Sequence, residues 1–193
     1  MLSSVKLALE FDAGRMKAEL DALTADAYVP HFNARYYQGD WSVLPLRSIG
    51  GAPAQIYPDP VKKDGWADTP YLERCPYIRA LLHGFRCPLQ SVRFLRLGPG
   101  STIREHKDYN LSLEDGEIRL HIPVHTNPDV DFVVNGQRVE MRAGECWYHN
   151  FNLPHSVVNR GSAARVHLTL DCVVDEWLRG LVERAAGIAA PLV

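Results

Sequence analysis

The sequence contains few cysteines, and none of them has the spacing of a metal or redox pair. Four cysteines occur among 193 residues, at Cys75, Cys87, Cys146 and Cys172, and no C-x-x-C motif joins any two of them. This excludes a zinc ribbon and a thioredoxin-like redox motif. The N-terminus lacks a secretory signal, so we expect reduced thiols in a cytoplasmic protein. A disulfide between Cys75 and Cys87 is the alternative, although disulfides are rare in the cytosol.

Long apolar runs and an excess of one charge are also missing. No run approaches the ~18–20 apolar residues of a membrane helix. The formal net charge is -2, so no overall field favours nucleic acid or an anionic membrane as a partner. Hydrophobic residues make up 46% and charged residues 23%, an ordinary globular balance. The length suits one domain covering residues 1–193.

The first half of the chain predicts helices and loops. Residues 3–24 carry an apolar stripe at helical spacing and predict a helix. Residues 28–70 show little periodicity, apart from a short strand candidate at 40–47. Residues 70–84 predict a second helix, entered at a proline. We therefore expect a helical and loop region over residues 1–89.

From residue 90 onward, short β-type runs follow one another between turn signals. We predict strands at 92–97, 102–106, 117–125, 131–134, 139–142, 145–149, 156–159 and 165–174. Asn135-Gly136 lies between two of these runs and is a strong hairpin signal. So many short strands in so short a stretch indicate a barrel or sandwich such as a jelly roll. The expected fold is mainly β, with a core at about 90–174 and a closing helix at 174–187.

Two of the predicted strands carry rows of polar side chains. Strand geometry places every second residue on one face, which groups Arg119, His121 and His125 in one strand and Arg165, His167 and Thr169 in another. These faces either contact solvent or line a polar pocket inside a barrel. Alternation does not say which face points inward, so both interpretations stay open at this point.

A histidine and a carboxylate two residues apart are a candidate pair of metal ligands. In an extended segment His106 and Asp108 project from the same side, roughly 6.5 Å apart at the backbone, and can converge on one ion. His155, at the start of a predicted strand, is the candidate third ligand, and His125 and His149 are its competitors. Two histidines and one carboxylate form the facial triad of non-haem Fe(II) oxygenases. Hydrolytic zinc is the alternative, but the sequence offers it no clear general base.

A spaced set of short motifs runs through the second half of the chain. They are RLGPGS at 96–101, HKD at 106–108, RLHIPV at 119–124, GECW at 144–147, PHSVVN at 154–159 and RVHL at 165–168. Together, residues 93–174 resemble the aspartyl/asparaginyl β-hydroxylase family of 2-oxoglutarate-dependent oxygenases, which includes hydroxylases of free proline. The resemblance covers a little under half of the chain. Its specificity lies in the spaced set rather than in any single motif.

This resemblance implies a double-stranded β-helix, a cupin-like jelly roll, with Fe(II) held by His106, Asp108 and His155. It also implies that Arg165 binds the distal carboxylate of 2-oxoglutarate, with His121 as a second contact to this cosubstrate. A guanidinium suits that task because it grips a carboxylate through two hydrogen bonds and stays charged. A surface arginine after the preceding turn is the alternative interpretation of Arg165.

Further candidates concern the substrate. Arg119 and Arg96 are candidates for a substrate carboxylate, and Trp41 for shaping the pocket. Solvated strand residues and a core aromatic are the corresponding alternatives. The resemblance implies a dioxygenase that hydroxylates an amino-acid-like or peptidyl substrate, and the competing reading is a non-catalytic cupin-like module that binds a metal or a small anion. The choice between a small-molecule and a peptide substrate stays open, as does a homodimer.

Overall fold

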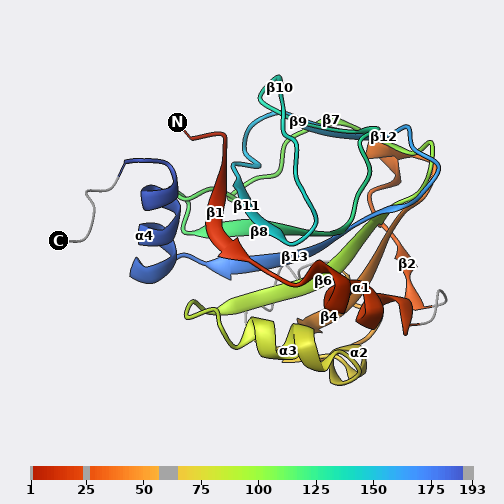
Figure 1. The fold of residues 1–193 in the computed structure, drawn as a ribbon, viewed down its shortest axis with the longest axis horizontal. Coiled ribbons are helices and arrows are strands. Elements are labelled where there is room, and N and C mark those ends of the chain that lie inside the picture. The colour runs from red at the N-terminus through yellow and green to blue at the C-terminus, as the bar shows by residue number, and fades with distance from the viewer. Residues whose placement is uncertain (1, 24–26, 57–64, 189–193) are drawn as a thin grey trace.

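The chain folds into two antiparallel β-sheets with helices against one of them (Figure 1). The computed structural model describes residues 2–23, 27–56 and 65–188, so part of the irregular segment predicted at 28–70 lies outside the described residues. The elements are β1 (Ser4–Glu10), α1 (Ala13–Asp21), β2 (Val29–Pro30), η2 (Ala34–Tyr36), β3 (Tyr37–Gln38), β4 (Trp41–Ile49), β5 (Trp66–Asp68), α2 (Pro70–Glu73), α3 (Pro76–Leu82), β6 (Leu89–Leu97), β7 (Thr102–His106), β8 (Glu117–His125), β9 (Val130–Val134), β10 (Gln137–Arg138), β11 (Glu145–His149), β12 (His155–Asn159), β13 (Arg165–Val173) and α4 (Glu176–Ala185). The predicted mainly β fold with flanking helices is confirmed.

The chain crosses repeatedly from one sheet to the other. The larger sheet has the strand order β1-β11-β8-β13-β6-β4-β2, with β5 paired to β4, and the smaller sheet has the order β10-β9-β12-β7-β3. From β6 to β13, the chain alternates between the two sheets except at the β9–β10 hairpin. This alternation is typical of a jelly roll. It places strands that are distant in the sequence side by side, which matters for the site described below.

The outer face of the larger sheet packs against the helices. Met16 of α1, Ile78 of α3 and Leu178 of α4 belong to one buried apolar cluster with Leu120 and Leu168 from the sheet. Figure 1 shows α1, α2 and α3 gathered on that side, away from the smaller sheet. Because neighbouring residues of a strand point to opposite faces, Arg119 and His121 of β8 and the polar row of β13 point into the space between the sheets, whereas His125 lies opposite Val166 beyond a shift in the register. The pocket interpretation of these rows is therefore the right one.

A second apolar cluster closes the space between the sheets. It contains Leu97 from the larger sheet, and Ile103, Phe132, Val134 and Val157 from the smaller one. The sandwich interior is thus apolar where the two sheets meet closely and polar where β8 and β13 carry their arginines and histidines. This division leaves room for a polar cavity inside an otherwise apolar core.

The prediction of one helix at 3–24 is wrong. Residues Ser4–Glu10 form strand β1, which pairs antiparallel with β11, and α1 begins only at Ala13. The apolar residues of β1 alternate with exposed ones, and Leu7 is buried, so a strand period was hidden inside the apparent helical stripe. Asp12 lies just before α1 and accepts a hydrogen bond from the backbone N–H of Arg15, which caps the helix.

Three further predictions change at their boundaries. No strand forms at 139–142, because only Gln137 and Arg138 pair back onto β9 after the predicted Asn135-Gly136 turn, in which both residues have positive φ. The helix predicted at 70–84 is split into α2 and α3, since Pro76 starts a new helix. The core is not confined to 90–174, because β1 and β4 belong to the larger sheet. The single domain over residues 1–193 stays a prediction.

All four cysteines are described, and they are buried free thiols. The alternative of a Cys75–Cys87 disulfide is therefore not realised. Among the helices in the described ranges, none has the length and apolar character needed to cross a membrane.

Candidate metal centre

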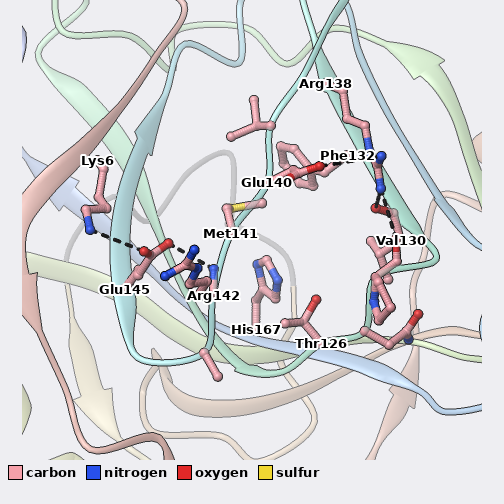
Figure 2. Close-up of a pocket in the computed structure, with 14 residues that line it drawn as sticks. Lys6, Thr126, Val130, Phe132, Arg138, Glu140, Met141, Arg142, Glu145 and His167 are labelled. Atoms are coloured by element: carbon pink, nitrogen blue, oxygen red, sulfur yellow. Dashed lines mark hydrogen bonds and ion pairs between the residues drawn. The ribbon is translucent and has the colours of Figure 1, made fainter.

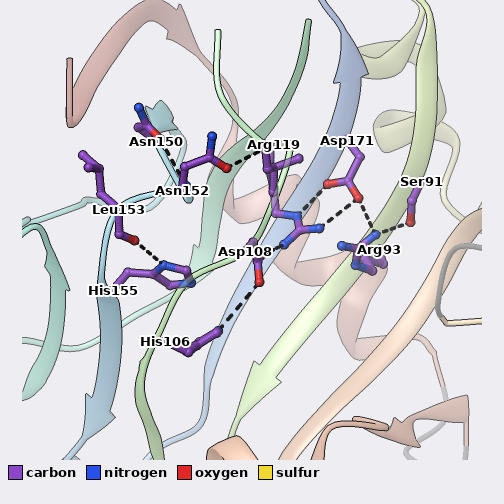
Figure 3. A network of polar contacts seen from close by, with 11 residues as sticks. Ser91, Arg93, His106, Asp108, Arg119, Asn150, Asn152, Leu153, His155 and Asp171 are labelled. Carbon is purple, nitrogen blue, oxygen red and sulfur yellow. Dashed lines mark hydrogen bonds and ion pairs between the residues drawn. The ribbon is translucent and has the colours of Figure 1, made fainter. Parts of the chain in front are cut away.

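Three ligand-type side chains converge where β7 and β12 pair. His106 ends β7, His155 begins β12, and the two residues face each other in the antiparallel register. Asp108 follows two residues after His106, and one ligand atom from each of the three residues lies within 4.8 Å of the others. The His106 and His155 ring centroids are 4.2 Å apart, and His106 Nε2 lies 4.0 Å from Asp108 Oδ1 (Figure 3). The fold thus brings together all three predicted ligands.

Both imidazoles are held with one nitrogen free. His106 Nδ1 lies 2.8 Å from the Arg104 carbonyl oxygen, and His155 Nδ1 lies 3.0 Å from the Leu153 carbonyl oxygen. A carbonyl only accepts hydrogen bonds, so Nδ1 is the donor in each ring, and in the neutral tautomer that fits this contact Nε2 carries the lone pair. Burial lowers the pKa of His155 to about 4, which keeps this ring neutral at physiological pH. Such backbone support is typical of metal-binding histidines.

An arginine and a second aspartate hold Asp108 in place (Figure 3). Arg119 Nη1 donates to Asp108 Oδ2 at 3.0 Å, which leaves Asp108 Oδ1 facing His106. The same guanidinium donates through Nε and Nη2 to the two oxygens of Asp171, at 2.6 and 3.1 Å. Burial alone would lower the pKa of Arg119, but Asp171 and Asp108 together raise it above its ordinary value. Arg119 is therefore engaged with two carboxylates and positions the proposed carboxylate ligand.

These residues line one cavity of about 490 Å³. Among the residues in its wall are Trp41, Arg93, His106, Asp108, Glu117, Arg119, His121, His155, Arg165 and Asp171. Every residue predicted for the site is included except Arg96. The structure therefore unites residues from β4, β6, β7, β8, β12 and β13 around one space.

Arg165 is buried in this cavity and has no anionic partner among the residues that the structure describes. The residue is 2% exposed, and Nη2 donates to His167 Nδ1 at 2.8 Å, whereas Nε has no hydrogen-bond partner among the described residues. Burial lowers the pKa of Arg165 to about 9. His121 lies beside it, with Nδ1 3.1 Å from His167 Nδ1 and a buried, unpartnered Nε2. Unpaired buried polar atoms are costly, so this end of the cavity fits a polar ligand that carries negative charge.

A second, larger cavity lies beyond His167 (Figure 2). It measures about 840 Å³, and its wall combines apolar residues such as Val130 and Met141 with the charged side chains of Arg142 and Glu140. His167 lines this second cavity, while its Nδ1 contacts Arg165 and His121 of the first. His167 is thus a packed residue between the two cavities rather than a candidate metal ligand.

The structure does not bring Arg96 to the cavity, so its predicted role at a substrate carboxylate requires correction. Arg96 pairs with Val166 of β13, a residue of the helix-facing apolar cluster, and its guanidinium lies 3.1 Å from Asp40. Side chains directly opposite each other in an antiparallel pair project from the same face. Arg96 therefore projects from the outer face of the sheet, whereas Arg93 on the same strand faces the cavity.

Arg93, Glu117 and Asp171 are charged residues of the cavity that sequence reasoning missed. Arg93 pairs with Thr169 in the register of β6 and β13, so it belongs to the same inward row as Arg165 and His167. Burial tends to raise the pKa of Asp171, but Arg119 and Arg93 lower it to about 2. The strand period alone was a usable signal for Asp171, which continues the polar row of Arg165, His167 and Thr169.

His125 and His149, the two competing candidates for the third metal ligand, lie outside the cluster, whereas Trp41 lines the cavity. His125 Nδ1 lies 2.6 Å from the Ala164 carbonyl oxygen, and His149 Nδ1 lies 2.9 Å from Ser4 Oγ. Neither histidine belongs to the described cluster of metal-ligand type. Trp41 lines the cavity and stacks on His31, with ring centroids 3.5 Å apart.

Buried histidines make the stability of the protein sensitive to acid. Burial is the first cause of a lowered pKa in each of five histidines: it falls to about 3 in His31 and His149, to about 4 in His155, and well below 6.5 in His121 and His167. These rings stay neutral in the folded state, while the unfolded chain takes up protons below about pH 6.5. The contribution of these neutral rings to folding stability is therefore present above pH 6.5 and is lost as the pH falls toward about 3.

Replacing His149 by asparagine is expected to flatten this acid dependence in the metal-free protein. One fewer proton is taken up on unfolding, so the slope of the unfolding free energy between pH 6 and 4 should fall by up to about 1.4 kcal/mol per pH unit. Urea denaturation at several pH values measures the slope. Ser4→Ala is the matched control, since it removes the hydrogen bond to the same ring but keeps the imidazole. An unchanged slope in His149→Asn would contradict the assignment.

Comparison with known proteins gives consistent results. A family model described as Aspartyl/Asparaginyl beta-hydroxylase matches residues 10–174. L-proline cis-4-hydroxylase of Rhizobium meliloti (strain 1021) is 27% identical over 168 residues, which cover 84% of this chain and 58% of the relative. L-proline cis-3-hydroxylase 1 of Streptomyces sp is 25% identical over 182 residues, or 91% and 61% of the two chains. The chain thus spans about three fifths of the length of these curated relatives.

Solved structures show the same fold. The non-heme alpha ketoglutarate dependent carbocyclase SnoK from nogalamycin biosynthesis aligns with a TM-score of 0.59 at 12% identity, covering 89% of this chain and 79% of that one. A 2OG-Fe(II) oxygenase family protein from Burkholderia pseudomallei aligns with a TM-score of 0.56 at 18% identity, covering 89% and 85%. At these identities the likeness concerns the jelly-roll fold alone.

Proposed function

The chain belongs to the aspartyl/asparaginyl β-hydroxylase family, and on that premise we propose that it is an Fe(II)- and 2-oxoglutarate-dependent dioxygenase that hydroxylates an amino-acid-like or peptidyl substrate. One observation carries the proposal: His106, Asp108 and His155 converge in the same cavity as the buried guanidinium of Arg165, which has no anionic partner within the described ranges. The two curated relatives, which are named as L-proline hydroxylases, support the substrate class.

The donor set fits both proposed groups. The free Nε2 atoms of His106 and His155 and a carboxylate oxygen of Asp108 would hold Fe(II), whose preferred ligands in such enzymes are two histidines and one carboxylate. Arg165 would bind the distal carboxylate of 2-oxoglutarate, with His121 beside it. When bound, Fe(II) and 2-oxoglutarate supply the oxidation of a C–H bond by dioxygen.

The protein itself orients these groups and shields them. Arg119 and Asp171 fix the Asp108 carboxylate, as the backbone carbonyls fix the two imidazoles. Aromatic rings flank the ligand rings: Tyr36 stacks on His106 at 5.0 Å between centroids, and Phe151 meets His155 edge-on at 4.7 Å. Prearranged ligands within an aromatic wall hold the target C–H bond close to the metal and limit the access of water.

A turnover assay with varied substrates tests the proposal. The protein is incubated with Fe(II), 2-oxoglutarate and ascorbate against a panel of free L-amino acids and short peptides. We expect at least one member to give succinate well above the substrate-free background, together with a product 16 Da heavier by mass spectrometry. If 2-oxoglutarate binds but is recovered unchanged with every member of the panel, the protein is a cupin-like binding module instead.

The cytoplasmic location and the homodimer stay predictions from the sequence. The same holds for the absence of a nucleic acid or membrane partner. The proposed activity depends on none of these.

A further inference from the structure

One arginine of the cavity has hydrogen-bond donors that no described residue uses. Arg93 is buried, and its Nη1 donates to Ser91 Oγ and, at 2.9 Å, to Asp171 Oδ2 (Figure 3). Its Nε and Nη2 atoms have no hydrogen-bond partner in the part of the chain that the structure describes, and the Arg93 side chain lines the cavity. The guanidinium therefore keeps two unused donors at the cavity wall.

The charge of Arg93 is only partly balanced. Asp171 accepts two hydrogen bonds from Arg119 and one from Arg93, so a single carboxylate serves two guanidinium groups. Burial lowers the pKa of Arg93 below its ordinary value in spite of this contact. A buried cation that shares its counterion has a strong need for a second anion.

A carboxylate with a free oxygen lies in the same cavity. Glu117 stands two residues before Arg119 on β8, so both side chains point inward. Its Oε1 accepts a hydrogen bond from Gln90 Nε2 at 3.1 Å, while its Oε2 has no hydrogen-bond partner within the described ranges. Glu117 is half-buried and available to a cationic group in the cavity.

Charge counting isolates these two residues. Among the described residues, the cavity wall carries three arginines and three carboxylates: Arg93, Arg119, Arg165, Asp108, Glu117 and Asp171. Asp171 balances Arg119, and under the proposed function Fe(II) takes Asp108 and 2-oxoglutarate takes Arg165. The positive charge of Arg93 and the negative charge of Glu117 then have no full counter-charge in the cavity. The two positive charges of Fe(II) and the two negative charges of 2-oxoglutarate cancel each other. A substrate that enters this buried space with neutral overall charge and both signs leaves no charge unpaired.

We propose that Arg93 and Glu117 form a zwitterion subsite, in which Arg93 binds the carboxylate and Glu117 the ammonium group of a free α-amino acid. This inference rests on the proposed function and narrows its substrate class. A residue inside a peptide chain carries neither charge, so an internal peptidyl substrate would leave buried Arg93 with only its shared carboxylate and half-buried Glu117 without a cation, and the subsite disfavours such substrates. A site that leaves its own charged groups without a partner discriminates against a substrate lacking those charges more strongly than apolar contacts discriminate between substrates of similar shape.

Binding of three matched probes tests the subsite. L-proline, L-prolinamide and N-acetyl-L-proline are titrated by calorimetry into the anaerobic protein loaded with Fe(II) and 2-oxoglutarate. We expect L-proline to bind about 30-fold or more tightly than either derivative, because each derivative loses one charge-assisted contact. If L-proline does not bind, the other protein amino acids are tested with their amides and N-acetyl forms.

Variants assign each charge to its residue. Arg93→Gln is expected to bind the free acid and the amide equally weakly, Arg93→Lys to recover part of the preference, and Glu117→Gln to lose discrimination against the N-acetyl form. Arg96→Gln, on the outer face of the same strand, is the matched control and should behave like the unmodified protein. Circular dichroism checks that each variant is folded.

The outcomes separate the two proposals. Amides or short peptides that bind as tightly as the free acid, or binding by no free amino acid, would overturn the zwitterion subsite. Tight, charge-selective binding without any succinate formation would leave the subsite standing and refute the oxygenase proposal. Loss of charge selectivity in Arg96→Gln, with selectivity kept in Arg93→Gln, would also overturn the subsite.

Discussion

Replacing His155 by alanine is expected to abolish turnover because the protein can no longer hold Fe(II) tightly. Within the described residues, the cluster has three protein ligand atoms, and Nε2 of His155 is one of them. Loss of a residue that merely supports a metal ligand typically weakens metal binding 10–100-fold, so loss of a ligand should cost at least about 100-fold. His106→Ala should behave in the same way. Anaerobic equilibrium dialysis with metal analysis gives the affinity, and succinate formation gives the rate.

His125→Ala is the matched control for this experiment. Its imidazole bonds to the Ala164 carbonyl oxygen and does not line the cavity, although the sequence made it a competitor for the third ligand position. We expect this variant to bind Fe(II) and to turn over like the unmodified protein. Retained iron in His155→Ala combined with lost iron in His125→Ala would reject the proposed trio and point to the competing ligand.

Arg165→Met is expected to have opposite effects on ligand binding and on stability. Affinity for 2-oxoglutarate should fall by about 100-fold or more, because the buried guanidinium supplies charge-assisted hydrogen bonds to the distal carboxylate. In the absence of 2-oxoglutarate, the variant should be more stable, by about 1–3 kcal/mol, since a buried cation without an anion is replaced by an apolar side chain of similar length. His167 Nδ1 keeps His121 as its partner, so the substitution strands no polar atom there.

Calorimetry measures the first effect, and urea unfolding without 2-oxoglutarate measures the second. Arg138→Met is the control: this arginine is 45% exposed and paired with Asp131, so its removal should change the unfolding free energy by less than about 1 kcal/mol. A destabilised Arg165→Met variant with unchanged 2-oxoglutarate affinity would make Arg165 a structural residue and would remove the cosubstrate site from this end of the cavity.

The second half of the chain was largely readable from its sequence. The strands at 102–106, 117–125 and 145–149 have the predicted bounds, because alternation and turn residues are local signals that act over a few residues. The Asn135-Gly136 hairpin formed for the same reason. The N-terminal strand was missed because its apolar residues also fit a helical stripe, and only the open edge of β11 decides between the two.

The site was predicted unevenly. Short spaced motifs singled out His106, Asp108 and His155, and the fold brings these three residues together, while their role as metal ligands stays a proposal. Arg93 was missed, and Arg96 was chosen in its place, because two arginines three residues apart on a strand point to opposite faces, and the sequence does not say which face is inward.

The sequence by itself determined where most strands of the second half lie, which residues carry metal-ligand chemistry, and which family the chain resembles. Only the tertiary structure decided that the polar rows face inward, that Arg119 serves Asp108, and that Arg93 and Glu117 share a cavity with the metal-ligand cluster. The physical reason is the range of the forces involved. Alternation and turns act within a few residues, whereas strand register and burial depend on pairing between segments far apart in the chain.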